Sequence, residues 1–428
     1  MKIAIIGSGI SGLTAAYYLA PHASVTLYEK APRLGGHTAT VDVTVDGRSY
    51  AVDTGFIVYN ERTYPNFIRM ISELGVAVKK TEMGFSVSSR QDGLEYSGSS
   101  LATLFAQKRN LFNPGHWRMI FDILRFNREA KRDLDGGRVA ADTTLGSYLT
   151  ENGYSHGFIH HYLVPMGAAI WSASTDAMLD FPMQFFIRFF HNHGLLQISN
   201  RPQWLVIEGG SRNYIAPLLA AAKPQMVTSA FITRIEKVGN QVELVMADGS
   251  RAQYDEVVFA THSNEALALL GSGATHQERS VLGAMPYQPN AVVLHTDEKL
   301  LPALKSTWSS WNYLLHSYRQ DRATLTYNMN LLQGLKAPVT FCVTLNDTAA
   351  IHPNKILARF SYDHPVFTRE SLAAQERWSD INGVEKRWYC GAYWRNGFHE
   401  DGVVSALRVV NAILAKAGKP TVPVLGHE

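Results

Sequence analysis

Residues 1–12 of this 428-residue chain read MKIAIIGSGISG, and this stretch decides the fold. The apolar run at 3–6 is short and continuous, which is typical of a parallel strand buried on both faces. It leads into GSGISG at 7–12, and residues 13–20 have the apolar spacing and the alanines of a helix. A G-x-G-x-x-G between a strand and a helix is the fingerprint of a Rossmann-type dinucleotide-binding domain.

Each glycine of the fingerprint has its own task. Gly7 permits the tight turn, Gly9 lets the backbone approach a pyrophosphate, and Gly12 lets the helix pack closely on the strand. The helix N-terminus presents free N–H groups and the positive end of its dipole to the phosphates. We therefore predict a dinucleotide site here, to which Ser8 and Ser11 also contribute.

A second strand is predicted at 24–28, and it ends at Glu29. This carboxylate lies seventeen residues after Gly12, close to the spacing at which the acidic residue of the fingerprint binds the ribose hydroxyls. The flanking strand, the helix and the acid make the fingerprint specific, because a glycine-rich turn that binds nothing needs none of them.

Turn signals and apolar periodicity outline the remaining elements. A hairpin is predicted at 41–52 around Asp46-Gly47, and a helix with a glycine stop at 65–75. Further along the chain we predict helices at 213–222 and 403–415, and strands at 227–238, 242–246, 257–260 and 387–390.

Composition narrows the function classes. The net charge of +3 is too small to argue for nucleic-acid binding, and two cysteines build neither a disulfide framework nor a cysteine-based metal site. Hydrophobic residues make up 46% of the chain, which suffices for a sizeable core. The first residues lack the apolar region of a signal peptide, and no run of eighteen apolar residues occurs. We therefore expect a cytoplasmic protein without a metal site, whose membrane contact would be at the inner face.

Residues 30–37, KAPRLGGH, resemble the R-x-G-G-R/H element of the flavin amine oxidase superfamily. In that superfamily the element follows the FAD pyrophosphate towards the flavin, and NAD dehydrogenases do not carry it. Residues 53–55 are similar to its D-x-G element near the flavin, and 399–402 to its last FAD element, where a helix begins beside the pyrimidine ring. One departure is Ala392, which stands where the family often has an acidic residue. The resemblance implies FAD, bound non-covalently.

The fingerprint and the resemblance together imply one set of cofactor-binding residues: Gly7, Ser8, Gly9, Ser11, Gly12, Glu29, Arg33, Gly35, Gly36, His37, Thr38, Gly55, Ile232, Ala260, Thr261, Gly391, Asp401, Gly402 and Val403.

The resemblance also implies an α/β fold like that of the amine oxidases, with a discontinuous Rossmann-type FAD-binding domain and an inserted α+β substrate domain. The FAD-binding domain would comprise 1–75, 201–262 and 385–428. The substrate domain would comprise 76–200 and 263–384.

Further stretches extend the resemblance over nearly the whole chain: 55–60 (GFIVYN), 192–195 (NHGL), 209–211 (GGS), 310–313 (SWNY) and 391–402 (GAYWRNGFHEDG). Together they look like the bacterial flavoproteins often encoded beside cyclopropane-fatty-acid synthases, and the flavin domain of plant cyclopropane fatty acid synthases is similar. This likeness implies an FAD-dependent oxidoreductase that takes a hydride from an unsaturated or modified fatty acyl chain of a membrane phospholipid.

Other functions stay open at this point. A flavin-dependent double-bond isomerase would act on the same acyl chains without net oxidation. Superfamily analogy also admits an amine oxidase or an isoprenoid desaturase. A further alternative is a non-catalytic flavoprotein that is accessory to a lipid methyltransferase partner.

Residues expected at the flavin face, and so candidates for catalysis, are His37, Tyr59, Trp171, His193 and Trp394. Adjacent histidines such as His160-His161 diverge by about 100° on a helix, which does not suit a metal site. Cys390 directly precedes a glycine at the end of a predicted strand, so we interpret it as a small core residue and not as a covalent flavin link.

Two segments are candidates for contact with lipid. In residues 105–132, an apolar helix face bears Trp117, Ile120, Phe121 and Leu124 amid five basic residues, which suits the surface of an anionic bilayer. The alternative is an amphipathic helix that packs on its own domain and exposes a basic side. Residues 178–200 are rich in Phe and Met, which can line an acyl pocket or simply form core.

Overall fold

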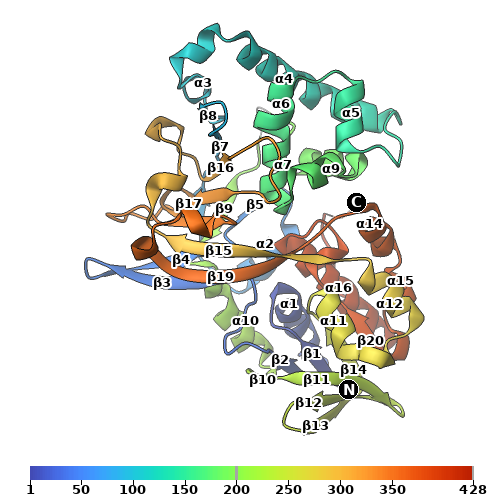
Figure 1. Ribbon diagram of the computed structural model, residues 1–428. Helices are drawn as coiled ribbons and strands as arrows, with labels where there is room; N and C mark the ends of the chain where they lie inside the picture. Colours follow the sequence, from blue (N-terminus) through green and yellow to red (C-terminus); the bar gives the residue numbers. More distant parts are fainter. Residues whose placement is uncertain (198–200, 427–428) are drawn as a thin grey trace.

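The computed structural model describes residues 1–197 and 201–426. The predicted ranges 76–200, 178–200 and 385–428 therefore end in residues that lie outside the described part. A small parallel sheet forms one end of the molecule, a larger mixed sheet its middle, and a layer of helices the other end (Figure 1).

The parallel sheet has five strands in the order β10-β2-β1-β14-β20. Its central strand β1 is buried from Ile3 to Ile6, which confirms the prediction from the apolar run. The strands span Gln225–Val227 (β10), Ser24–Tyr28 (β2), Lys2–Ile6 (β1), Glu256–Phe259 (β14) and Arg387–Tyr389 (β20).

Helices pack with this sheet into one hydrophobic core. They are α1 (Ile10–Leu19), α2 (Pro65–Glu73), α10 (Ile215–Ala222), α11 (Ser263–Leu270), α12 (His276–Gly283), α14 (Arg369–Glu376), α15 (Trp378–Ile381) and α16 (His399–Lys416). Cys390 is fully buried in the same core, as the sequence predicted. The domain boundaries stay a prediction, and α11 and α12 share this core although they follow residue 262.

Two predicted elements were wrong in extent. The strand predicted at 227–238 is broken at Ser229, whose φ is +52°, so that β10 lies in the parallel sheet and β11 (Ile232–Val238) begins a separate one. That antiparallel sheet continues with β12 (Gln241–Met246) and β13 (Arg251–Tyr254). The helix predicted at 403–415 begins already at His399, because the Asp401 carboxylate accepts the Phe398 N–H and caps it there.

The middle sheet has seven strands in the order β19-β15-β18-β17-β16-β7-β8. A long antiparallel pair, β15 with β19, edges it (Figure 1). The strands span Ile356–Pro365 (β19), Tyr287–His295 (β15), Cys342–Leu345 (β18), Leu325–Asn328 (β17), Trp311–Leu315 (β16), Phe85–Ser89 (β7) and Leu94–Ser97 (β8).

Smaller elements connect the two sheets. The predicted hairpin is confirmed as β3 (Thr40–Val45) and β4 (Arg48–Asp53). A three-stranded sheet has the order β5-β9-β6 and joins segments from both predicted domains: Val58–Asn60 (β5), Trp204–Ile207 (β9) and Val78–Thr81 (β6). The short α13 covers Met329–Leu332.

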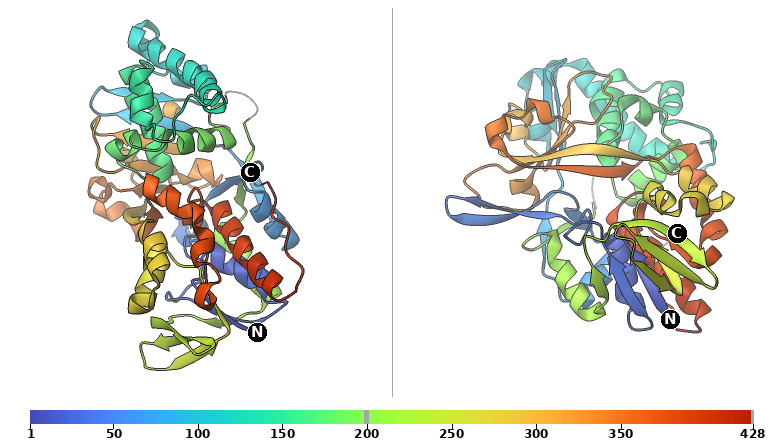
Figure 2. Two further views of the ribbon diagram at one scale, coloured as in Figure 1. Left: turned by 90° about the vertical axis from the view of Figure 1, so that its right-hand side faces the viewer. Right: turned by 60° about the horizontal axis from the view of Figure 1, so that its bottom comes forward.

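The helical layer lies at the end opposite the parallel sheet (Figure 2). It comprises α3 (Leu101–Leu104), α4 (Pro114–Asp135), α5 (Leu145–Glu151), α6 (His156–Phe158), α7 (Val164–Trp171), α8 (Thr175–Leu179) and α9 (Met183–Asn192), with the turns η1 (Lys108–Phe112) and η2 (Ile159–Leu163). The helix expected within 105–132 thus starts only at Pro114, because the Asn113 side chain accepts backbone N–H groups and caps it there.

Candidate cofactor and active site

The glycine loop at 7–12 makes the turn from β1 to α1. Gly7 has a φ of +100°, a conformation that favours glycine, and its N–H donates to the Tyr28 carbonyl over 2.8 Å. A Cβ on Gly12 would lie 1.9 Å from the Gly7 carbonyl oxygen, whereas a Cβ on Gly9 would meet no atom within 4 Å. Gly7 and Gly12 therefore serve the turn and the packing, and Gly9 borders open space where a pyrophosphate is expected.

Two helices begin beside this loop. The N-cap of α1 is Gly9, which has no side chain to cap the helix, so the N–H groups of the first turn remain available to phosphate. The Ser11 hydroxyl donates to the Gly402 carbonyl over 2.9 Å, which places the first turn of α16 against α1. The N–H of Gly391 donates to Ser405 of α16 over 3.0 Å. Two positive helix ends therefore face the same region.

Glu29 is held in place at the end of β2. Its carboxylate accepts the Ser8 N–H (2.9 Å), the Ser8 hydroxyl (2.5 Å) and the Ala31 N–H (2.8 Å). The Ser8 carbonyl in turn accepts the Gly35 N–H over 3.1 Å. The predicted ribose ligand is thus fixed to the glycine loop and to the following double-glycine element.

Ile232 lies near this acid through a short loop. The Glu29 N–H donates to the Val227 carbonyl and the Ala230 N–H donates to the Glu29 carbonyl, each over 2.9 Å. The Ile232 N–H then donates to the Ala230 carbonyl over 3.2 Å. The residue predicted beside adenine therefore follows a segment that is bonded to the predicted ribose ligand.

The double-glycine element folds over the glycine loop. Arg33 donates to the carbonyls of Gly36 (2.9 Å) and Thr38 (3.3 Å), which curls residues 33–38. A Cβ on Gly36 would lie 3.0 Å from the Gly9 Cα. Glycine is required at this contact because the two backbones approach each other closely.

The next residues lead from this element towards α16. A Cβ on Gly55 would lie 2.1 Å from the His37 carbonyl oxygen, so only glycine fits there. The Thr38 hydroxyl lies 2.6 Å from the Tyr214 hydroxyl, which lies 3.0 Å from Nε2 of His399. His399 is buried, and burial holds the pKa of its imidazole well below the usual value.

Ala260 and Thr261 lie where β14 ends. The Ala260 N–H donates to the Ile6 carbonyl over 2.8 Å, and the Ala260 carbonyl oxygen would lie 2.7 Å from a Cβ on Gly7. The Thr261 hydroxyl donates to the His262 carbonyl over 3.1 Å. Both predicted contacts therefore border the glycine loop at the carboxyl edge of the sheet.

The other predicted residues of α16 occupy its first turns. Gly402 and Val403 are buried. Asp401 is buried too, and this burial raises the pKa of its carboxyl to about 6, against the opposing effect of Arg395 at 3.7 Å. Its contact with the Phe398 N–H makes it a helix cap, a role that the sequence analysis missed.

A cluster of histidines surrounds His37. Its ring centroid lies 5.0 Å from Tyr362, 5.9 Å from His364 and 6.0 Å from His262. Burial, and then the neighbouring histidines, lower the pKa of His37 to about 3, and burial with His262 lowers that of His364 to about 4. These imidazoles are therefore uncharged at neutral pH.

An aromatic cluster reaches the same region from the helical layer. Trp171, at the end of α7, lies 4.7 Å from Phe189 of α9. Phe189 stacks on His193 at 3.9 Å and lies 5.1 Å from Phe398, the residue before α16. Burial lowers the pKa of His193 to about 4, so this imidazole is also neutral.

Twelve buried side-chain N or O atoms among the described residues have no hydrogen-bond partner, and four of them belong to aromatic side chains of the candidate site: Tyr59 OH, Trp171 Nε1, Tyr393 OH and Trp394 Nε1. Three of them belong to the predicted catalytic residues. Buried donors of this kind usually have a partner, so these atoms suit contact with a bound molecule. Together with the open space at Gly9 and the two helix ends, they fit a dinucleotide cofactor.

The structure brings some predicted catalytic residues together and separates others. Trp171 and His193 both contact Phe189. Tyr59 lies instead behind Phe56, at 6.3 Å, and Phe56 stacks on His399 at 3.6 Å. Trp394 lies 5.4 Å from Tyr393. Tyr287 stacks on His262 at 4.1 Å. Seven neighbours in these clusters were not predicted from the sequence: Phe56, His262, Tyr287, Tyr362, His364, Phe398 and His399.

The two lipid-contact segments differ in outcome. In the described part of 178–200, most large apolar side chains are buried, including Phe186, Phe189 and Phe190, so they form core and pack around Trp171. In α4, by contrast, the face with Trp117 and Phe121 is exposed, while other residues of the helix are buried. No helix among the described residues is long and apolar enough to cross a membrane. Within those residues, no three His, Cys, Asp or Glu side chains gather as a metal site would require.

Comparisons with known proteins agree with this architecture. Residues 5–74 match the family model of the NAD(P)-binding Rossmann-like domain. The structure of cyclohexylamine oxidase from Brevibacterium oxydans superposes with a TM-score of 0.69 over 98% of this chain and 99% of that one, at 15% identity. The chain has the fold of the flavin amine oxidases. A fatty acid isomerase from P. acnes that produces CLA shares this amine-oxidase-like fold, with a TM-score of 0.67 and 16% identity over 96% of this chain and 97% of that one.

Two curated relatives are similar in sequence. Human prenylcysteine oxidase 1 is 25% identical over 314 residues, which cover 62% of this chain and 57% of that protein. Protoporphyrinogen oxidase from Schizosaccharomyces pombe is 27% identical over 168 residues, which cover 35% and 32%. The chain thus spans from about a third to just over half of the length of these relatives.

Proposed function

We propose that this protein binds FAD non-covalently and oxidises an unsaturated or modified fatty acyl chain, carried by a membrane phospholipid. FAD fits the dinucleotide site because Arg33 and the double glycine curl back onto the glycine loop, and because α16 begins beside α1. Bound there, FAD would supply the acceptor for a hydride.

The observation that carries the substrate class is the position of Phe189. It joins Trp171, His193 and Phe398, so an aromatic wall runs from the helical layer to the start of α16. The imidazole in this wall is neutral. These side chains are buried or half-buried, and we place the acyl chain against this cluster because apolar surroundings suit an apolar chain better than a charged one. The isomerase named for a fatty acid, which shares the fold, and the relative named for prenylcysteine support the same class.

His193 would take the proton. Its Nδ1 lies 3.0 Å from the Phe189 carbonyl oxygen, which only accepts, so Nδ1 carries the hydrogen. Because the ring is neutral, Nε2 then holds the lone pair. An acyl chain that loses a hydride from one carbon would give a proton from the next carbon to this Nε2, and a new double bond would form.

A double-bond isomerase on the same chains is the second candidate, since a fatty acid isomerase shares the fold. In this reaction the hydride would return to another carbon of the chain. No net oxidation would then be seen.

The test mixes the purified protein anaerobically with phospholipids bearing mono-unsaturated, methylated or cyclopropane acyl chains. Flavin absorbance and lipid mass spectrometry are followed together. Bleaching with loss of two hydrogens from one lipid supports the oxidase, and a shifted double bond without bleaching supports the isomerase. If neither occurs, polyamines and aryl amines are tried as substrates, and a lipid methyltransferase is added as a partner. Turnover of an amine, or turnover only with the methyltransferase, would overturn the proposal.

A variant pair checks the proton acceptor. We expect His193→Gln to slow flavin reduction by at least about 100-fold with its flavin content unchanged. His191→Gln, two residues away, should keep the wild-type rate. Equal rates in the two variants would remove His193 from the mechanism.

A further inference from the structure

The most exposed apolar side chains gather in one segment of the helical layer. Within residues 101–124 lie six of the seventeen exposed large hydrophobic residues of the described chain, and three of its four exposed Phe or Trp. Phe112 is 88% and Phe121 63% exposed. We call these six residues the docking surface: Leu101, Leu111, Phe112, Trp117, Phe121 and Leu124. Single exposed apolar residues are scattered over most protein surfaces, whereas a cluster of them marks an interaction site.

The docking surface is held in shape before any partner arrives. Nε1 of Trp117 donates to the Leu111 carbonyl over 2.9 Å, which fixes η1 against α4. The ring of Phe105 lies 4.9 Å from that of Trp117. α4 buries its opposite face, with Met119 and Phe126 in the core of the helical layer. The exposed face is therefore not an unpacked end of the core.

Positive charge accompanies the surface. Residues 105–138 contain eight Lys or Arg against four Asp or Glu, a net charge of +4 that exceeds the +3 of the whole chain. The buried acids Asp122 and Asp133 each pair with two arginines, whereas Arg128, which lies 3.5 Å from Glu129, keeps a side chain that is 74% exposed. Apolar aromatics ringed by basic residues match the interface of a membrane that contains anionic lipid.

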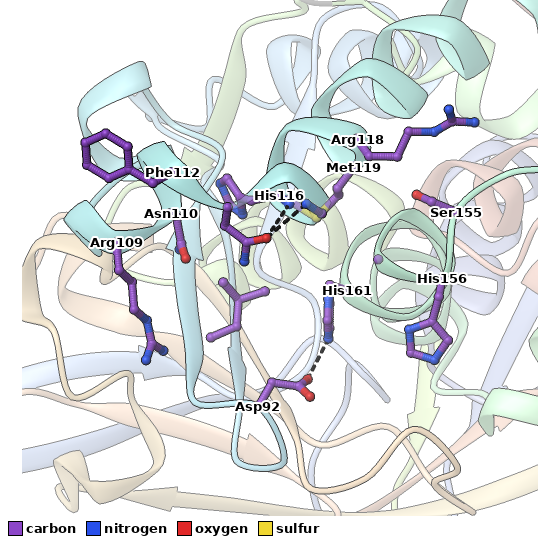
Figure 3. Close-up of a pocket in the computed structure, with 14 residues that line it drawn as sticks. Asp92, Arg109, Asn110, Phe112, His116, Arg118, Met119, Ser155, His156 and His161 are labelled. Atoms are coloured by element: carbon purple, nitrogen blue, oxygen red, sulfur yellow. Dashed lines mark hydrogen bonds and ion pairs between the residues drawn. The ribbon is translucent and has the colours of Figure 1, made fainter.

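A pocket of about 660 Å³ adjoins the docking surface (Figure 3). Phe112 belongs to both, and Arg109 and Arg118 lie on opposite sides of the pocket. Asp92 also lines it, but its carboxylate is engaged by His161 at 2.7 Å and by the Tyr318 hydroxyl at 2.6 Å. Arg118 pairs with Asp122 at 3.2 Å and Arg109 donates to the Gly93 carbonyl, and the remaining N–H groups of each guanidinium can donate to a phosphate.

We propose that the docking surface binds an anionic phospholipid bilayer, with one lipid headgroup in the adjoining pocket. The three aromatic side chains would enter the region between headgroups and acyl chains, and the basic residues would lie at the level of the lipid phosphates. The protein would then sit on the membrane with α4 in its plane.

This position suits the proposed function, although the binding does not depend on it. Phe126 of α4 lies 6.4 Å from Phe186 of α9, the helix that also carries Phe189. The helical layer therefore separates the membrane from the start of α16 by two helices.

The test is flotation of the whole protein with vesicles, without turnover. Vesicles of phosphatidylcholine alone are compared with vesicles that contain about 30% phosphatidylglycerol, at about 0.05 M and about 0.5 M NaCl. We expect binding to the anionic vesicles that weakens with salt. Phe112→Ser with Phe121→Ser should weaken it at least about tenfold, as should Arg128→Glu. Arg109→Gln should weaken binding to the anionic vesicles only.

Matched controls lie outside the surface. Leu331→Ser removes an exposed apolar side chain from α13, and Lys419→Glu reverses an exposed charge after α16. Both should bind as the wild type does, and all variants should keep the wild-type melting temperature and flavin content. Equal binding of the double Ser variant and the wild type would overturn the proposal, as would equal affinity for both vesicle types.

Self-association is the competing occupant. If the wild type is a dimer in solution and the double Ser variant a monomer, the surface is an interface between copies, and the membrane proposal falls. Vesicle binding without flavin reduction would leave the docking surface standing and overturn the acyl oxidation. Flavin reduction by dispersed lipid without vesicle binding would overturn the docking surface and leave the acyl oxidation standing.

Discussion

The hydroxyl of Ser11 donates a 2.9 Å hydrogen bond to the carbonyl oxygen of Gly402, 391 residues away. The bond joins the first turn of α1 to the first turn of α16. It brings the two ends of the sequence together at the predicted cofactor site, so that both helix dipoles point their positive ends there.

Gly402→Ala should lower the flavin content of the purified protein. A Cβ at this position would lie 2.7 Å from Cγ2 of Ile10 and 2.9 Å from the Ser11 hydroxyl, so the two helix ends must move apart. The ratio of flavin to protein absorbance measures the effect. Gly283→Ala, in α12, is the control, because its Cβ would have its nearest neighbour at 4.0 Å. Full flavin content in Gly402→Ala would contradict the proposed arrangement.

Gly9→Ala and Gly12→Ala should fail in different ways. The Cβ of Ala at position 9 would enter open space, so we expect this variant to fold with an unchanged melting temperature of the apoprotein but to lose its cofactor. At position 12 the Cβ would lie 1.9 Å from a backbone oxygen, which should prevent the helix from packing on β1. Thermal melting and flavin content are measured on both. A Gly9→Ala variant that keeps its flavin would show that the pyrophosphate lies elsewhere.

Asp53→Asn should cost about 2 to 4 kcal/mol of unfolding free energy. Asp53 is buried, and its carboxylate accepts hydrogen bonds from Thr40 (2.6 Å), Ser211 (2.9 Å) and Gln333 (2.8 Å), which link separate segments of the chain. The side-chain amide of asparagine would place its own N–H groups against one of these hydrogen-bond donors, and that hydrogen bond would be lost. Urea unfolding measures the loss.

Asp42→Asn is the matched control in the same hairpin. Asp42 pairs with both terminal nitrogens of Arg212, at 2.7 and 2.6 Å, yet the two side chains are 53% and 42% exposed. We expect a loss below about 1 kcal/mol, because water screens an exposed pair. If Asp42→Asn lowered the unfolding free energy as much as Asp53→Asn does, burial would not explain the cost of these substitutions.

The buried imidazole of His295 should lower the unfolding free energy of the protein in acid. The ring is buried, its Nδ1 accepts the Asp297 N–H over 3.0 Å, and burial lowers its pKa to about 4. The unfolding free energy therefore falls as the pH drops from 6.5 to about 4, because in this range the unfolded chain binds a proton that the buried ring does not. Between pH 7.5 and pH 5 the loss should be about 2 kcal/mol. Between the same two pH values, the unfolding free energy of His295→Gln should fall by about 2 kcal/mol less than that of the wild type. An equal fall in the two proteins would show that His295 is not a cause of the acid sensitivity.

The sequence sufficed for elements whose signal is local. The β1 strand, the glycine turn and the β3–β4 hairpin follow from residues that are neighbours in the chain, and the structure has them as predicted. The break at Ser229 escaped notice because apolar residues continue on both sides of it. The early start of α16 escaped because the cap is the Asp401 side chain, which the resemblance had assigned to the cofactor.

The surroundings of His37 could not be predicted in the same way. His364 and Tyr362 lie on β19, which pairs with β15 over residues far apart in the sequence. Only the register of that pair places them beside His37, and a single sequence holds no record of a register between distant strands. His399 and Phe398, by contrast, stood inside a recognised motif and could have been included.

The most direct test of the account is the identity of the bound molecule. The wild-type protein is purified in its native state and denatured with acid, and the released small molecules are separated and identified by mass. We expect FAD, close to one per chain, with no flavin left on the polypeptide, and no FAD from the Gly9→Ala variant. Release of NAD or NADP, absence of any flavin, or flavin that stays attached to the chain would contradict it.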